Sequence, residues 1–217
     1  MKGRFLSEGY YVDLNLKYSG VFKSAQSKRR ANHKHLLRMH FSKQLAVHWK
    51  QHETLSQYDP KALQYAEKGK NWFDVERPVG DRGLFWKHHI RAYNVIPLVT
   101  HIHLMHCHLA IRMHCPRGHG SILYEGGDID NRLKVLLDAL SMPQDESQIP
   151  SSVASADPDA SEPLFCLLES DELVTKLSVE MFPLLDEDQE PAYVQMDIDV
   201  HVDPIFPMNA NLPMLFR

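Results

Sequence analysis

The segment from residue 126 to residue 140, GGDIDNRLKVLLDAL, constrains the fold more than any other part of this chain. A glycine-rich loop at residues 116–127 leads into it. Its apolar side chains recur at helical spacing, and they are Ile129, Leu133, Leu136, Leu137 and Leu140. Residues 128–140 are therefore predicted to form an amphipathic helix, whose apolar face needs a hydrophobic surface to pack against.

Strand-like segments on both sides of this helix can supply that surface. Gly9 to Tyr18 and Leu173 to Phe182 are rich in strand formers, and Tyr193 to Val202 alternates cleanly between apolar and polar residues. Pro97 to Cys115 alternates in part, which predicts a strand or a hairpin. The chain is expected to form one α/β (α+β) domain over residues 1–217, with a mixed β-sheet packed by helices.

Charge is distributed unevenly along the chain, although the net charge is only −4. Residues 14–52 contain nine lysines and arginines and no acidic residue, whereas residues 141–204 contain sixteen acidic residues against Lys176 alone. Within the acidic half, residues 142–163 are dense in Pro, Ser, Asp and Ala, so a flexible acidic loop insertion is expected there. The basic region 14–52 is expected to meet an anionic partner, and a solvated surface is the alternative.

The basic region includes a second predicted helix, Ser27 to Gln51, which contains neither glycine nor proline. Its first half is crowded with positive charge. The candidate contacts to nucleic-acid phosphates are Lys28, Arg29, Arg30, Lys34 and Arg38. Such contacts are electrostatic and need no reading of base sequence.

Two carboxylates, Asp128 and Asp130, stand at the start of the amphipathic helix. Asp130, Lys134 and Asp138 follow one another at intervals of four residues, so they share the polar face. Clustered carboxylates favour a hard cation such as Mg²⁺, and a nearby lysine can offset phosphate charge. The alternative is a helix cap with surface ion pairs, but a cap needs only one carboxylate.

The sequence DIDNRLK at residues 128–134, followed by LDAL at 137–140, resembles the D-x-D-N-x-x-K-x-x-x-D-A-L signature of RusA-type Holliday junction resolvases. This resemblance implies a RusA-like fold and an endodeoxyribonuclease that hydrolyses phosphodiesters at Holliday junctions or other branched DNA. It also implies a homodimer. In that family a third acidic residue precedes a strand, and Asp171 is the candidate here, with Glu169 and Glu172 as alternatives.

The resemblance further implies a role for each matching residue. Asp128, Asp130 and Asp171 would bind Mg²⁺ (or Mn²⁺), while Lys134 would act near the scissile phosphate. Asn131 and Asp138 would support the site. Two other functions stay open: a nuclease acting on flaps, forks or RNA, and a catalytically inactive RusA-like module that binds nucleic acid.

The 14 histidines of the chain raise the question of a transition-metal site, since His101, His103, His106 and His108 fall within one strand-like segment. The spacing of a structural zinc site does not occur, so half-buried strand positions are the favoured interpretation, and a zinc-binding interaction protein is the alternative. Three scattered cysteines predict no disulfide framework. With no apolar run of membrane-spanning length and no signal peptide, a cytoplasmic location is expected.

Overall fold

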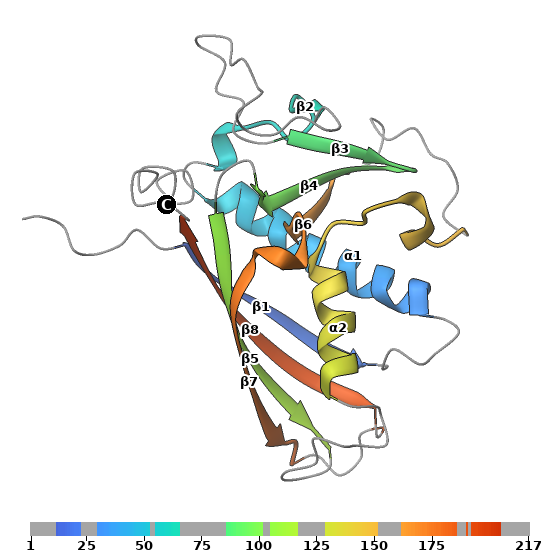
Figure 1. Cartoon of the computed structure of the whole chain (residues 1–217), viewed down its shortest axis with the longest axis vertical. Coiled ribbons are helices and arrows are strands. Elements are labelled where there is room, and N and C mark those ends of the chain that lie inside the picture. The colour runs from blue at the N-terminus through green and yellow to red at the C-terminus, as the bar shows by residue number, and fades with distance from the viewer. Residues whose placement is uncertain are drawn as a thin grey trace, which may run out of the picture.

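The computed structural model describes residues 12–22, 30–52, 55–65, 86–101, 105–116, 129–151, 162–185, 190 and 192–204. Within these residues two α-helices and two mixed β-sheets form a mixed α/β fold (Figure 1). The helices are α1 (Arg30–Gln51) and α2 (Ile129–Leu140). Both helix predictions are confirmed. Neither helix is long and apolar enough to cross a membrane.

The larger sheet, called the main sheet below, has the strand order β1-β8-β5-β7. β8 pairs antiparallel with both β1 and β5, while β7 pairs parallel with β5 at the edge. These strands are β1 (Val12–Val21), β5 (Met105–Cys115), β7 (Val174–Pro183) and β8 (Tyr193–Pro204). The predicted strands at 173–182 and 193–202 are thus confirmed. The first strand ends at Val21, three residues later than expected, while residues 9–11 of its prediction lie outside the described part.

The two faces of the main sheet differ because side chains alternate along each strand. On β5, Cys107, Leu109, Ile111 and Met113 are buried in the core, together with apolar side chains of α1 and α2. The intervening residues lie on the opposite face, called the open face below. On β5 these are His106, His108, Ala110, Arg112 and His114.

The second sheet has the order β2-β3-β4-β6. Its strands are β2 (Gln64–Tyr65), β3 (Trp86–Ile90), β4 (Tyr93–Val99) and β6 (Leu164–Leu168). All five residues of β6 are buried, and α1 packs against this strand through Trp49 and Phe165, whose ring centroids are 5.2 Å apart. The segment 97–115 is therefore not a hairpin, because β4 pairs with β3 and β6 while β5 pairs with β7 and β8.

The predicted flexible insertion at 142–163 is wrong for its first ten residues. Met142 and Ile149 are buried, and Arg91 donates a hydrogen bond to the carbonyl of Ile149 at 2.9 Å. Between them a short 3₁₀ helix is capped by Asp145, which accepts a hydrogen bond from the backbone N–H of Ser147 at 2.7 Å. Two apolar anchors and a cap thus offset the cost of ordering a polar segment. Residues 152–161 lie outside the described part.

Candidate functional site

The polar face of α2 presents Asp130 and Lys134 to solvent, one helical turn apart, with Asn131 half-buried between them. Arg132 anchors this end of the helix, because its buried guanidinium donates toward the sulfur of Cys115 at 3.7 Å. The start of α2 therefore lies beside the last residue of β5. Asp128, the other predicted ligand at this end, lies outside the described residues.

Asp171 lies at the opposite end of α2 from Asp130. The backbone N–H of Met142, just beyond the last turn of α2, donates to the carbonyl of Leu168 at 2.8 Å. Gln144 donates to the carbonyl of Glu169 at 2.9 Å, so the acidic segment 169–172 adjoins the C-terminal end of the helix. A helix of 12 residues is about 18 Å long.

The pairing of β5 with β7 also indicates that Asp171 lies far from the start of α2. Val174, three residues after Asp171, pairs with Cys107 near the start of β5, whereas α2 begins beside Cys115 at its end. Ligands of one Mg²⁺ ion lie within about 4.2 Å of each other, twice its bond length. Asp130 and Asp171 of one chain therefore do not fit a single ion, and the predicted three-carboxylate site is not assembled within one chain.

The other acidic candidates near Asp171 are accounted for differently. Glu169 accepts a hydrogen bond from the backbone N–H of His101 at 2.8 Å, which ties it to the loop after β4. Glu172 is exposed in the short 3₁₀ helix Asp171–Leu173, where Ser170 is the N-cap. Neither lies at the start of α2, so neither completes a site with Asp130.

The predicted phosphate contacts of the basic helix are only partly within the described residues. Lys28 and Arg29 lie outside the described residues, and Arg30 begins α1 without a described side chain. Lys34 forms an ion pair with Asp138 of α2, which joins two residues predicted to act in different sites. Positive charge on this part of α1 therefore stabilises the contact between the helices.

Arg38 is the clearest correction to the sequence prediction. Its side chain is 1% exposed, its Nη2 donates to the carbonyl of Asp138 at 2.7 Å, and its Nε donates to that of Ser141 at 3.1 Å. The last carbonyls of a helix have no partners within the helix, and Arg38 satisfies that of Asp138 in the last turn of α2, together with the carbonyl of Ser141 just beyond it. The prediction that Arg38 contacts phosphate is wrong, because the guanidinium is buried in this interface.

Burial beside Arg38 also makes the stability of the fold depend on pH. Desolvation, with a smaller contribution from the Arg38 charge, lowers the pKa of His35 to about 4. Between pH 6.5 and pH 4 the unfolded chain binds a proton here that the folded chain does not, so stability falls as the pH falls. We expect the free energy of unfolding to fall by about 2 kcal/mol between pH 7 and pH 5 because of His35.

Urea denaturation at the two pH values, with His35→Gln beside the wild type, measures this loss. The variant should lose less stability on acidification than the wild type. Equal losses in the two proteins would show that His35 does not carry the effect.

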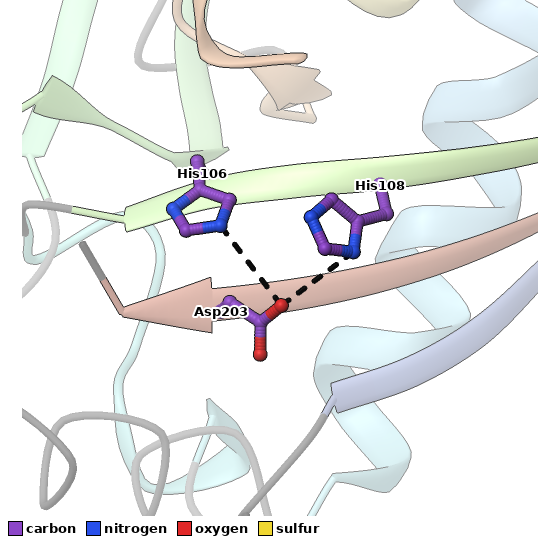
Figure 2. A group of neighbouring side chains, drawn as sticks. All are labelled: His106, His108 and Asp203. Atoms are coloured by element: carbon purple, nitrogen blue, oxygen red, sulfur yellow. Dashed lines mark ion pairs between the residues drawn. The ribbon is translucent and has the colours of Figure 1, made fainter. Parts of the chain in front are cut away.

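The open face of the main sheet carries a second cluster that the sequence did not predict. His106 and His108 on β5 lie opposite Asp203 and His201 on β8 in the antiparallel register. The Oδ2 atom of Asp203 is 3.9 Å from Nε2 of His106 and 3.6 Å from Nδ1 of His108 (Figure 2). Its Oδ1 atom is 3.4 Å from Nε2 of His201. All four side chains are half-buried.

The prediction of half-buried strand histidines is confirmed for His106 and His108, but their partners were missed. The available signal was the pair of i, i+2 motifs, His106 with His108 and His201 with Asp203, in two alternating segments. Alternation puts each pair on one face, but only the register brings the pairs together. Cys107 points to the other face, where burial raises the pKa of its thiol to about 12.

Comparison with models of known protein families, with curated proteins and with solved structures found no match to this chain.

Proposed function

We propose that this chain is a metal-dependent endonuclease of the RusA type that hydrolyses phosphodiesters in Holliday junctions or other branched DNA. The observation that carries the proposal is the placement of its signature on α2, with Asp130 and Lys134 exposed on one face at the start of the helix. Surface ion pairs alone do not explain these residues, because all fixed positions of the signature that lie within the described residues match. They are Asp130, Asn131, Lys134, Asp138, Ala139 and Leu140.

The two exposed residues offer complementary chemistry to a phosphodiester. Asp130, with Asp128 two residues before it, offers carboxylate oxygens of the kind that Mg²⁺ and Mn²⁺ prefer. The ammonium group of Lys134 lies one turn further along the same face and can offset charge on the phosphate. Asp138 is two turns beyond Asp130 and is held by Lys34, so it orients α2 against α1 and does not face the substrate.

A homodimer is part of the proposal, and β7 is the surface that favours it. Within the described residues β7 borders only β5, so its outer edge offers unpaired backbone groups. Leu177, Met181 and Phe182 on this strand are each more than a third exposed. A second copy that pairs antiparallel with β7 would cover these side chains and extend the main sheet across the two-fold axis.

Antiparallel pairing of the two β7 strands would also bring together acidic residues that lie far apart within one chain, Asp130 and Asp171. Antiparallel pairing places the start of one β7 beside the end of the other. Asp171 of the partner subunit, just before its β7, would then lie at the end of the sheet where α2 and Asp130 begin. The proposed site therefore combines Asp128 and Asp130 of one subunit with Asp171 of the partner subunit.

The test of the proposed activity uses a synthetic four-way junction and a linear duplex of matched sequence, each with Mg²⁺, Mn²⁺ or EDTA. We expect paired nicks in the junction that EDTA abolishes, and little cleavage of the linear duplex. Metal-dependent cleavage of both substrates would instead indicate a nuclease of broader substrate range. Binding of the junction without cleavage in any metal would favour an inactive module, and absence of binding would refute the proposal.

The dimer surface can be tested separately by light scattering. We expect the wild type to be a dimer and Leu177→Lys to be a monomer, because a charge on the paired edge would lose its solvation. Leu36→Lys is the matched control, since Leu36 is 68% exposed but lies on α1. A monomeric wild type, or a dimeric Leu177→Lys variant, would exclude pairing through β7.

A further inference from the structure

The histidine–aspartate cluster on the open face has the composition and geometry of a transition-metal site. His106, His108 and Asp203 each offer one ligand atom, and these three atoms all lie within 4.8 Å of one another. Zn–N and Zn–O bonds are about 2.1 Å, so two ligand atoms of a tetrahedral ion are roughly 3.4 Å apart. The Oδ2 atom of Asp203 lies 3.6 Å and 3.9 Å from the two imidazole nitrogens, which is close to that spacing.

The register of two strands holds these donors in place. His106 pairs directly with Asp203, and His108 is two residues along on the same face of β5. The imidazole rings of His106 and His108 have centroids 5.3 Å apart, and both are directed toward the Asp203 carboxylate (Figure 2). A small change in side-chain torsion angles would bring the three atoms onto one ion, with no movement of the backbone.

His201 supports the cluster from the other side of the carboxylate. It lies 3.4 Å from the Oδ1 atom of Asp203, while Oδ2 faces the other two histidines. A contact at one carboxylate oxygen orients the other, as is common around metal ligands. The ring of His201 also stacks on that of His108, with centroids 5.6 Å apart and an angle of 24° between the planes.

The types of ligand atom favour a transition-metal ion. Imidazole nitrogen binds such ions in its neutral form. Two imidazoles and one carboxylate select Zn²⁺, Co²⁺ or Ni²⁺ over Mg²⁺, which prefers a shell made only of oxygen atoms.

We propose that His106, His108 and Asp203 bind one divalent transition-metal ion, with His201 as the residue that positions the carboxylate. The site is separate from the proposed nuclease centre, since it lies on the open face while α2 packs on the core face of the sheet. Three protein ligands leave an open position on a tetrahedral ion. His108 and His201 of the cluster also line an open concavity of about 550 Å³, together with Lys176, Ser178 and Asp199.

The experiment is a titration of the metal-free full-length protein with Co²⁺, followed by visible absorption, with displacement by Zn²⁺. We expect one equivalent of Co²⁺ to produce the absorption bands of a tetrahedral or five-coordinate ion. His108→Gln and Asp203→Asn should each weaken binding at least about 100-fold, and His201→Gln roughly 10- to 100-fold. Circular dichroism in EDTA checks that each variant keeps the fold.

Two controls separate this site from other metal-binding groups. His114→Gln changes a half-buried histidine on the same strand and face that stacks on Phe182, outside the cluster, and it should bind Co²⁺ as the wild type does. Asp130→Asn should also retain the Co²⁺ site, whether or not the nuclease proposal holds. Unchanged binding in His108→Gln and Asp203→Asn, or no stoichiometric binding by the wild type, would overturn the proposal.

Discussion

Asp130→Asn is expected to reduce cleavage of a four-way junction at least about 100-fold while junction binding is retained. The substitution removes one negative charge and keeps the size of the side chain. Asp130 is exposed in the first turn of α2, and the anchor of this end of the helix is Arg132, so the fold should be unaffected. Gel-based cleavage and binding assays on the same protein preparation measure the two effects.

The control for this prediction is Asp59→Asn, which changes an exposed aspartate away from α2 and should cleave as the wild type does. Cleavage by Asp130→Asn at the wild-type rate would refute the assignment of α2 as the catalytic helix. A parallel loss of binding and cleavage would mean that Asp130 contributes to substrate affinity and not to the chemical step.

Asp171→Asn shows whether the proposed site is shared between subunits. Alone, it should lose cleavage as Asp130→Asn does. In a mixture of the two inactive variants, each mixed dimer would contain one site with both substitutions and one with neither. With random exchange of subunits, roughly a quarter of the sites would be intact, and cleavage should return. An inactive mixture would exclude a shared site, and an active Asp171→Asn variant would exclude Asp171 from catalysis.

Several elements could be predicted from the sequence because their signal is local. The helix α2 follows from one apolar stripe, and β8 follows from strict alternation. The separation of β4 from β5 could not be predicted, because two consecutive strands can pair with each other or join different sheets. That choice depends on β6, which is distant in sequence and pairs with β4.

The candidate sites also differ in how far local sequence could predict them. The signature on α2 is contiguous, so the exposed positions of Asp130 and Lys134 follow from helical spacing alone. The location of Asp171 depends on how the chain returns after β6, and its distance from Asp130 was not predictable. The cluster of His106, His108 and Asp203 required the register of β5 with β8, which joins residues about 95 positions apart, by the difference of their numbers.

Arg38→Ala is expected to destabilise the fold by about 3 kcal/mol or more, the second of the two largest effects. The carbonyls of Asp138 and Ser141 would lose charge-assisted hydrogen bonds, and truncation would leave a cavity in a fully buried part of the interface. The lost contacts join α1 to the end of α2. Urea denaturation at pH 7 measures the change in the free energy of unfolding.

Lys43→Ala is the matched control, since Lys43 is an exposed cation on the same helix and should change stability by no more than about 0.5 kcal/mol. The pair of variants separates the two interpretations of the basic helix. A nucleic-acid contact would weaken junction binding in Arg38→Ala and leave its stability close to that of Lys43→Ala. If Arg38 is structural, Arg38→Ala should instead lose stability and keep its affinity for the junction. The reason is that the guanidinium donates both hydrogen bonds to carbonyls at the end of α2 and is buried, where phosphate cannot reach it.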